Sequence, residues 1–315
     1  MQLHHTSGRW QLGLALALST VSLWGVLPIA LDIVLEVVDP YTLIWFRFLM
    51  AFSLVGVLLL TKKQVPTWKT LRSTRLDLLA IATLFLALNY FFFTQGLLQT
   101  SPTNSQVIIQ LAPVFLGIGA IAIFRERYTT IQWIGLGILT SGMSLFFDDQ
   151  WQAMVAAPNQ YLMGSGAIAI AALVWAVYAL AQKQLLQQLP STVIMWFVYG
   201  GSALLFSPMA SPSHLLSLTP LQWAMLLFSG LNTVLAYGAF AEALDHWEAS
   251  RVSAVLSLTP VVTLISVAIA SSLFPRFVTA EIISHWGILG ALLVVIGSFS
   301  VALGKRVRPT AAIEE

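Results

Sequence analysis

Long apolar runs are the feature that most constrains how this chain can fold. They recur along the whole sequence at lengths of about twenty residues, which is what an α-helix needs to cross a hydrocarbon core of about 30 Å. Charged residues make up 9% of the chain, whereas a soluble domain carries about 25%. The sequence therefore predicts an all-α membrane protein. Ten transmembrane helices are expected, over residues 12–31, 41–60, 78–98, 103–124, 131–147, 162–180, 192–209, 221–244, 252–274 and 286–303.

The positions of Lys and Arg predict how these helices are oriented. Thirteen of the 15 such residues lie at the N-terminus, in the even-numbered connections or at the C-terminus. The other side carries Arg276, and Arg47 lies inside the second run. Because Lys and Arg collect in cytoplasmic loops, both termini are expected in the cytoplasm, with the protein in the plasma (inner) membrane. The basic segment 62–75 is interpreted as a topology determinant and a contact for anionic lipids, and not as a nucleic-acid site.

The chain also repeats itself. Tyr90 and the "LAPV" segment at 111–114 match Tyr237 and the "LTPV" segment at 258–261 at an offset of 147 residues. Trp24 matches Trp175, and Gly135 and Gly142 match Gly290 and Gly297. An odd number of helices in each half turns the second half over, so two inverted five-helix repeats are expected. The predicted parts are a cytoplasmic N-terminus (1–11), a first repeat (12–147), an outer connecting loop (148–161), a second repeat (162–303) and a cytoplasmic tail (304–315).

Several of these segments resemble one membrane protein family. The runs "LWGVLPIAL" (23–31), "DPYTLIWFRF" (39–48) and "LAPVFLGIGAIAIFRERYTTIQWIGLGILTSG" (111–142), and their counterparts "LVWAVYAL" (173–180), "ASRVSAVLSLTPVV" (249–262) and "WGILGALLVVIG" (286–297), are similar to EamA-type transporters of the drug/metabolite transporter superfamily. The resemblance implies ten helices, a central cavity and transport of small metabolites, often export of amino acids or related compounds. The family's Glu-Arg turn is present at Glu126-Arg127, whereas Glu281 follows an insertion and lacks the arginine, so a remodelled second turn is expected.

Two ionisable residues inside the apolar runs need a reason, because each costs about 2.5–3.5 kcal/mol to insert. Arg47 is interpreted either as an anion-binding or gating group, or as a snorkelling arginine paired with Asp32, Glu36 or Asp39. Glu242 is interpreted either as a proton or cation site, or as an interfacial residue paired with Arg251.

The repeat-matched prolines, Pro113 and Pro260, lie inside the fourth and ninth runs. Because proline removes a helix hydrogen bond and bends the helix, they are candidate hinges, with close packing as the alternative. Gln110 and Ser257, three residues before each proline, are polar and would lie beside the freed carbonyls.

Other polar and aromatic side chains within the runs are expected to face the bundle interior, because polar groups avoid lipid. Each contacts either substrate or a neighbouring helix. The candidates for a substrate cavity are Trp24, Asn89, Tyr90, Gln110, Trp175, Tyr178, Asn232, Tyr237 and Ser257.

The sequence contains no Walker A loop and no H-E-x-x-H motif. An ATP site, a metal site and a cofactor are therefore not expected, and neither is enzymatic activity. The partners expected are a small-molecule substrate and the lipid bilayer. The leading hypothesis is a carrier that alternates access through a central cavity. The other hypotheses are a membrane-embedded enzyme and a non-transporting sensor or scaffold.

Overall fold

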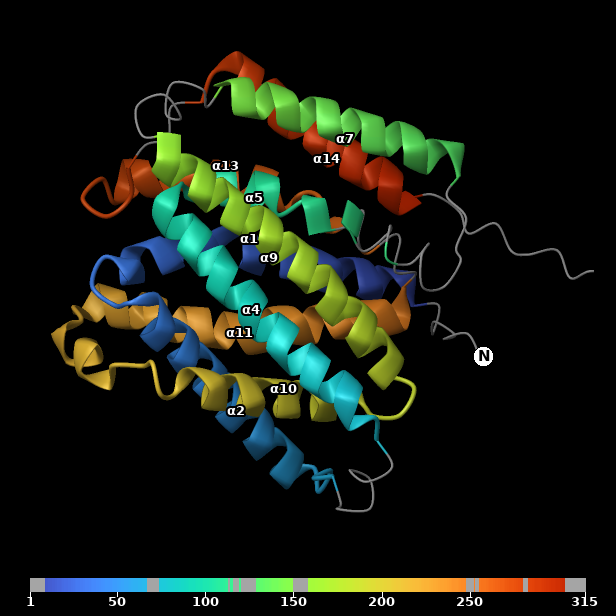
Figure 1. The fold of residues 1–315 in the computed structure, drawn as a ribbon, viewed down its shortest axis with the longest axis vertical. Coiled ribbons are helices and arrows are strands. Elements are labelled where there is room, and N and C mark those ends of the chain that lie inside the picture. Colours follow the sequence, from blue (N-terminus) through green and yellow to red (C-terminus); the bar gives the residue numbers. More distant parts are fainter. Residues whose placement is uncertain are drawn as a thin grey trace, which may run out of the picture.

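The computed structural model describes residues 9–66, 74–112, 114–115, 119, 129–149, 158–247, 252, 255–279 and 283–303. Throughout these residues the regular secondary structure is helical (Figure 1). The helices are α1 (Trp10–Leu35), α2 (Pro40–Thr61), α4 (Leu76–Gln99), α5 (Pro102–Ile108), α7 (Thr130–Asp149), α9 (Pro158–Leu185), α10 (Ser191–Phe206), the 3₁₀ helix η1 (Pro212–Ser217), α11 (Pro220–His246), α13 (Thr259–Leu273) and α14 (His285–Leu303).

Length and surface both suit a bilayer. Five helices are long and apolar enough to cross it, namely α1, α2, α4, α9 and α11, and α7, α10, α13 and α14 are shorter apolar helices. Large apolar side chains such as Leu204 and Leu60 lie exposed on the outside of the bundle. A soluble monomer rarely exposes apolar surface so widely, so these side chains face lipid.

Three helices begin with the same N-terminal motif, in which a capping residue is followed by proline. Asp39, Ser101 and Thr219 accept hydrogen bonds from backbone amides of the first turns of α2, α5 and α11. Proline is favoured at the first helical position because its missing N–H would have no partner there. The expected starts of the second and eighth runs therefore lie within one residue of the observed ones.

The two halves pair with each other in a regular pattern. α1 packs on α11, α4 on α9, α2 on α10, α5 on α13 and α7 on α14. The first helix of each half thus contacts the third helix of the other, and the second, fourth and fifth helices contact their own counterparts. Exchanging the halves leaves this pattern unchanged, as it does for inverted repeats related by a two-fold axis.

The matched glycines lie where α7 and α14 touch, along the upper edge of Figure 1. A Cβ atom at Gly142 would lie 2.7 Å from the carbonyl oxygen of Gly290, and one at Gly297 would lie 2.7 Å from that of Gly135. These two contacts are equivalent under the repeat. Small residues allow membrane helices to approach this closely.

The prediction of one continuous helix over residues 252–274 was wrong. Residues 255–256 are helical, Ser257 and Leu258 form a turn, and α13 starts at Thr259. Pro260 cannot donate to the carbonyl of Leu256, and the hydroxyl of Thr259 donates to it instead, at 2.6 Å. The fourth run also has a turn, at Ile109 and Gln110. This turn ends three residues before Pro113, which lies outside the described residues.

Helix ends differ elsewhere by a few residues. α1 extends to Leu35, four residues past the expected end, and α9 begins at Pro158, four residues before its expected start. α7 reaches Asp149, so part of the predicted connecting loop, 148–161, is helical at both ends.

Candidate functional site

Aromatic rings from six helices meet at the interface between the two halves. We call this the aromatic cluster. Tyr90 of α4 stacks on Tyr237 of α11 with ring centroids 6.5 Å apart. Because these two residues are matched by the repeat, their contact lies where the two halves meet. The members of the cluster are Trp24, Phe48, Tyr90, Trp175, Tyr178, Tyr199, Tyr237 and Phe240.

Ring contacts link the cluster into one unit. Trp24 meets Tyr237 edge-on at 5.2 Å, and Tyr178 meets the same ring at 6.5 Å. Trp24 and Trp175 both contact Phe240, at 5.7 and 6.4 Å. Four of the predicted cavity residues besides Tyr90 are therefore brought together here. All four tyrosines of the cluster are buried.

Arg47 of α2 lies beside the cluster, and its side chain is 3% exposed. Its Nε donates to the carbonyl oxygen of Ser229 over 3.3 Å, and its Cζ lies 4.5 Å from the centre of the Tyr90 ring. The predicted pairing with Asp32, Glu36 or Asp39 was wrong: in the described part of the chain no carboxylate lies within 4 Å of this guanidinium. The snorkelling alternative fails as well, because the side chain is buried.

Hydroxyl groups connect Arg47 to the tyrosines. The Ser229 carbonyl also accepts from Thr233 Oγ1 at 3.0 Å. Thr233 in turn accepts from Tyr90 through its hydroxyl, at 3.5 Å, and from Tyr199 through its carbonyl, at 3.1 Å. Sequence reasoning missed Ser229 and Thr233 because neither belongs to a matched pair. The sequence feature that could have identified them is local: they are polar residues one helical turn apart, and Thr233 follows Asn232 directly.

Asn89 and Asn232 hold paired helices together. Asn89 Nδ2 donates to the carbonyl of Ala171 at 2.9 Å, and Asn232 Nδ2 donates to that of Leu23 at 2.6 Å. Each amide thus links the third helix of one half to the first helix of the other. The contact of Asn89 agrees with a role in helix packing. Asn232 makes an equivalent contact, but its Oδ1 is a buried hydrogen-bond acceptor without a partner.

Three consecutive carbonyls of α1 accept side-chain hydrogen bonds from three different helices. Leu23 accepts from Asn232 of α11, Trp24 accepts from Gln106 of α5 at 3.1 Å, and Gly25 accepts from Thr263 of α13 at 2.8 Å. Pro28 lies inside α1 and has no N–H for the Trp24 carbonyl four residues earlier. Gln106, one turn before Gln110, is therefore the glutamine of this segment that contacts a residue of the aromatic cluster.

The residues before the two prolines lie elsewhere. Gln110 Oε1 accepts from Ser298 of α14 at 3.4 Å, and Ser257 is buried in the turn before α13. No ring or hydrogen-bond contact recorded among the described residues joins Gln110 to the aromatic cluster. Pro260 is buried at the start of α13.

Glu242 is also remote from the cluster. Its side chain is 61% exposed and lies 3.5 Å from Nε2 of His246, one turn further along α11. The partner expected from the sequence, Arg251, lies outside the described residues. The exposed position agrees with an interfacial residue and not with a buried proton site.

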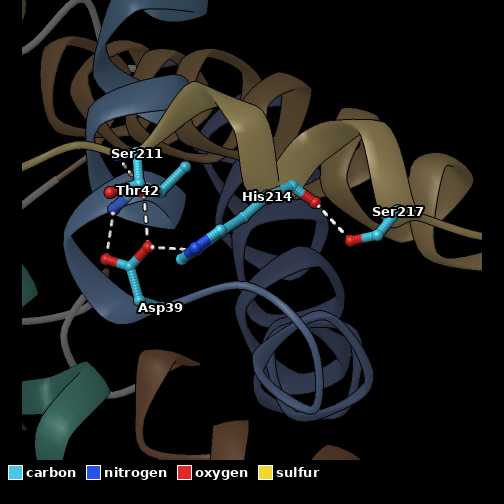
Figure 2. A network of polar contacts seen from close by, with 5 residues as sticks. All are labelled: Asp39, Thr42, Ser211, His214 and Ser217. Carbon is cyan, nitrogen blue, oxygen red and sulfur yellow. Dashed lines mark hydrogen bonds and ion pairs between the residues drawn. The ribbon is translucent and has the colours of Figure 1, made fainter.

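A second polar network joins the start of α2 to η1 (Figure 2). Asp39 accepts from the amide of Thr42 at 3.0 Å and from its hydroxyl at 2.6 Å, and its Oδ2 lies 3.1 Å from His214 Nδ1. Partial burial raises the pKa of Asp39, but the hydrogen bonds from Thr42 and His214 outweigh it, so the pKa lies below its usual value. The network ties α2 to η1, because Ser211 N donates to the Thr42 hydroxyl.

Metal binding has no visible basis here, since the described residues contain no group of three His, Asp or Glu side chains that could hold an ion. The site therefore offers aromatic faces, hydroxyls, amides and one buried cation.

Comparison with known proteins identifies the family. The model of the EamA-like transporter family matches residues 11–147 and again 162–303. The chain belongs to the EamA-like transporter family. It is an all-α integral membrane transporter with ten membrane helices in two inverted five-helix repeats, as the sequence predicted.

Relatives within the EamA-like family align along nearly the whole chain. A protein of Escherichia coli K12 named as an uncharacterized inner membrane transporter, YhbE, is 39% identical over 94% of this chain and 92% of its own. An uncharacterized transporter of Haemophilus influenzae is 36% identical, covering 95% and 97%. A probable amino-acid metabolite efflux pump of Salmonella typhimurium is 24% identical, covering 95% and 97%. One crystal structure shares the fold, with a TM-score of 0.64 at 18% identity, over 92% of this chain and 96% of that one.

Proposed function

We propose that this transporter exports a small metabolite, an amino acid or a related compound, by alternating access at the aromatic cluster. The observation that carries the proposal is the stacking of Tyr90 on Tyr237. Substrate sites of inverted-repeat transporters lie near the midplane between the repeats, and the contact between these repeat-matched residues supports a site at that position.

The relatives support the class of substrate and the location. The Salmonella relative is named for efflux of amino-acid metabolites, and the Escherichia coli relative is named for the inner membrane. By this likeness the chain works in the inner membrane. The distribution of Lys and Arg supports cytoplasmic positions for both termini.

The fourth and ninth membrane segments are proposed as the moving elements. Both are interrupted by a turn, at Ile109–Gln110 and at Ser257–Leu258, and a break in a helix is where its two parts can change their angle. Both segments are also hydrogen bonded to α1 through Gln106 and Thr263. A shift of either segment against α1 must therefore break a hydrogen bond next to the aromatic cluster.

Reconstitution into liposomes tests the proposal. Purified protein is reconstituted with an entrapped pool of labelled amino acids and their derivatives, and efflux is followed over time. The variant Tyr237→Leu removes a central ring, and Trp286→Leu, at a residue 64% exposed on α14, is the matched control. Selective, saturable efflux is expected from the wild type and the control. Tyr237→Leu should lose about tenfold, as expected for about 1.4 kcal/mol of lost substrate contact.

One result would argue against the proposed site, and another would argue against a carrier. Efflux that Tyr237→Leu leaves unchanged would place the substrate elsewhere. No efflux of any compound from folded, inserted protein would favour the sensor or scaffold hypothesis, and conversion of a lipid-linked compound would favour the enzyme.

A further inference from the structure

Arg47 is a buried cation, and no described carboxylate forms an ion pair with it. Among the described residues, the ionisable groups that act on it electrostatically are Tyr90, Tyr199 and Tyr237, all phenols that are neutral at physiological pH. In the described residues its guanidinium makes one recorded hydrogen bond, from Nε to the Ser229 carbonyl. The terminal nitrogens therefore have no acidic partner there.

A buried guanidinium is best satisfied by a planar anion. Its terminal N–H groups match the two oxygens of a carboxylate, and charge-assisted hydrogen bonds of this kind are about twice as strong as neutral ones. The Tyr90 ring compensates part of the charge through its face. The Ser229 carbonyl holds the Nε side of the group, so the opposite edge is the one left for a ligand.

The surroundings of Arg47 also disfavour a substrate that carries a positive charge in addition to its carboxylate. A zwitterionic amino acid brings an ammonium group together with its carboxylate, and the ammonium needs a carboxylate or carbonyl partner. Among the described residues, the recorded electrostatic and ring contacts of the cluster join aromatic side chains and Arg47, and the carboxylate of Glu242 is exposed beside His246. Among the described residues, the site can therefore pair the charge of a carboxylate with that of Arg47, whereas no carboxylate is recorded there to pair the charge of an ammonium group.

We propose that Arg47 selects the charge of the substrate, and that the preferred substrate is an organic monoanion: a carboxylate attached to an apolar or aromatic body without a free ammonium group. N-acylated amino acids and 2-oxo acids belong to this class. The inference rests on the proposed function for its physiological meaning, but binding tests it independently of transport. The carboxylate pairs with Arg47, and the body lies against the rings of Tyr90 and Tyr237.

The charge of the loaded and empty carrier follows from this pairing. With a monoanion bound, the site is neutral, and after release it carries the charge of Arg47. A membrane potential that is negative inside draws the empty, positively charged site inward. The cycle therefore exports one negative charge, and the potential drives it without a proton.

Binding to a matched series of ligands tests the charge rule. N-acetylphenylalanine, phenylalanine and N-acetylphenylalaninamide share one body and are an anion, a zwitterion and a neutral amide. Affinity is measured from the shift in thermal stability of purified protein across a concentration series, and the phenylacetate and phenylacetamide pair repeats the comparison with a smaller body. The wild type should bind each anion at least about tenfold more tightly than its amide, the factor given by about 1.4 kcal/mol.

Three variants make the result specific. Arg47→Gln should bind anion and amide equally, and Arg47→Lys should keep a reduced preference for the anion. Arg75→Gln, the same change at an arginine whose side chain is 57% exposed, should behave as the wild type. A wild type that binds amide or zwitterion as tightly as the anion, or that shows no carboxylate-dependent shift with either body, overturns the inference. So does an Arg47→Gln protein that keeps the preference.

Transport separates this inference from the proposed function. In liposomes with an imposed potassium potential, negative inside, N-acetylphenylalanine efflux should accelerate in the wild type. Arg47-dependent binding without any efflux would retain the anion site and reject the carrier. Efflux of zwitterions that is unaffected by Arg47→Gln would retain the carrier and reject the anion site.

Discussion

Replacing Gly142 by alanine should destabilise the contact between α7 and α14. The added Cβ would lie 2.6 Å from the amide nitrogen of Val294 and 2.7 Å from the carbonyl oxygen of Gly290. Both are backbone atoms and cannot rotate away, so the helices must separate. Overpacking costs about 1–3 kcal/mol, and backbone contacts place this case at about 3. Alanine is better than glycine in a helix by about 0.5–1 kcal/mol, which leaves a net loss of about 2 kcal/mol.

Gly137 on the same helix provides the control, since a Cβ there meets nothing within 4 Å. Gly137→Ala should gain the helix preference alone, about 0.5–1 kcal/mol, so the two variants should differ by about 3 kcal/mol. Unfolding in mixed micelles with increasing sodium dodecyl sulfate, followed by tryptophan fluorescence, measures both. Equal stability of the two variants would refute the close-packing argument.

Three further predictions follow. Asn89→Leu should lose about 0.6 kcal/mol, an average interhelical hydrogen bond, in the same unfolding assay, whereas Asn232→Leu should lose less because it also removes the unpartnered Oδ1. Asp39→Ala should lose about 1 kcal/mol of capping. Because the folded-state pKa of Asp39 is lowered, this contribution is present above the unfolded-state pKa of about 3.9. It is lost as the pH falls through the folded-state pKa, so the two proteins should converge in acid; a constant difference would contradict this. The chain has no cysteine, so a cysteine at Ser213 should react with an impermeant maleimide on intact cells and one at Gln64 only after lysis; the reverse pattern would invert the topology.

Much of the architecture was predictable because it depends on two properties that can be read along the sequence: the length of the apolar runs and the constant offset between the two halves. Apolar length sets the spans, and the residue offsets between the halves predicted which positions are equivalent. The stacking of Tyr90 on Tyr237 and the glycine contacts of α7 with α14 follow from that equivalence once the halves pair.

Contacts of individual side chains were harder to predict, and Arg47 shows why. Asp39 caps the same helix eight positions before Arg47, which is about 12 Å along the axis at 1.5 Å per residue. Its carboxylate is also occupied in capping α2. Nearness in sequence therefore gave the wrong partner, and the observed one, the carbonyl of Ser229, belongs to a helix in the other half. Because every residue has a backbone carbonyl, the residue types could not indicate which carbonyl Arg47 contacts.

The exchanged pairing of the halves determines how the chain must assemble as it is synthesised. α1 ends at Leu35, whereas its partner α11 begins only at Pro220. At about 5–20 residues per second this interval lasts roughly ten to forty seconds, during which the carbonyl of Leu23 lacks the hydrogen bond that it later accepts from Asn232 of α11. α7 must likewise wait for α14, the last described helix of the chain. Neither half is a self-sufficient folding unit, so a first half made alone should be degraded unless the second half is supplied as a separate polypeptide.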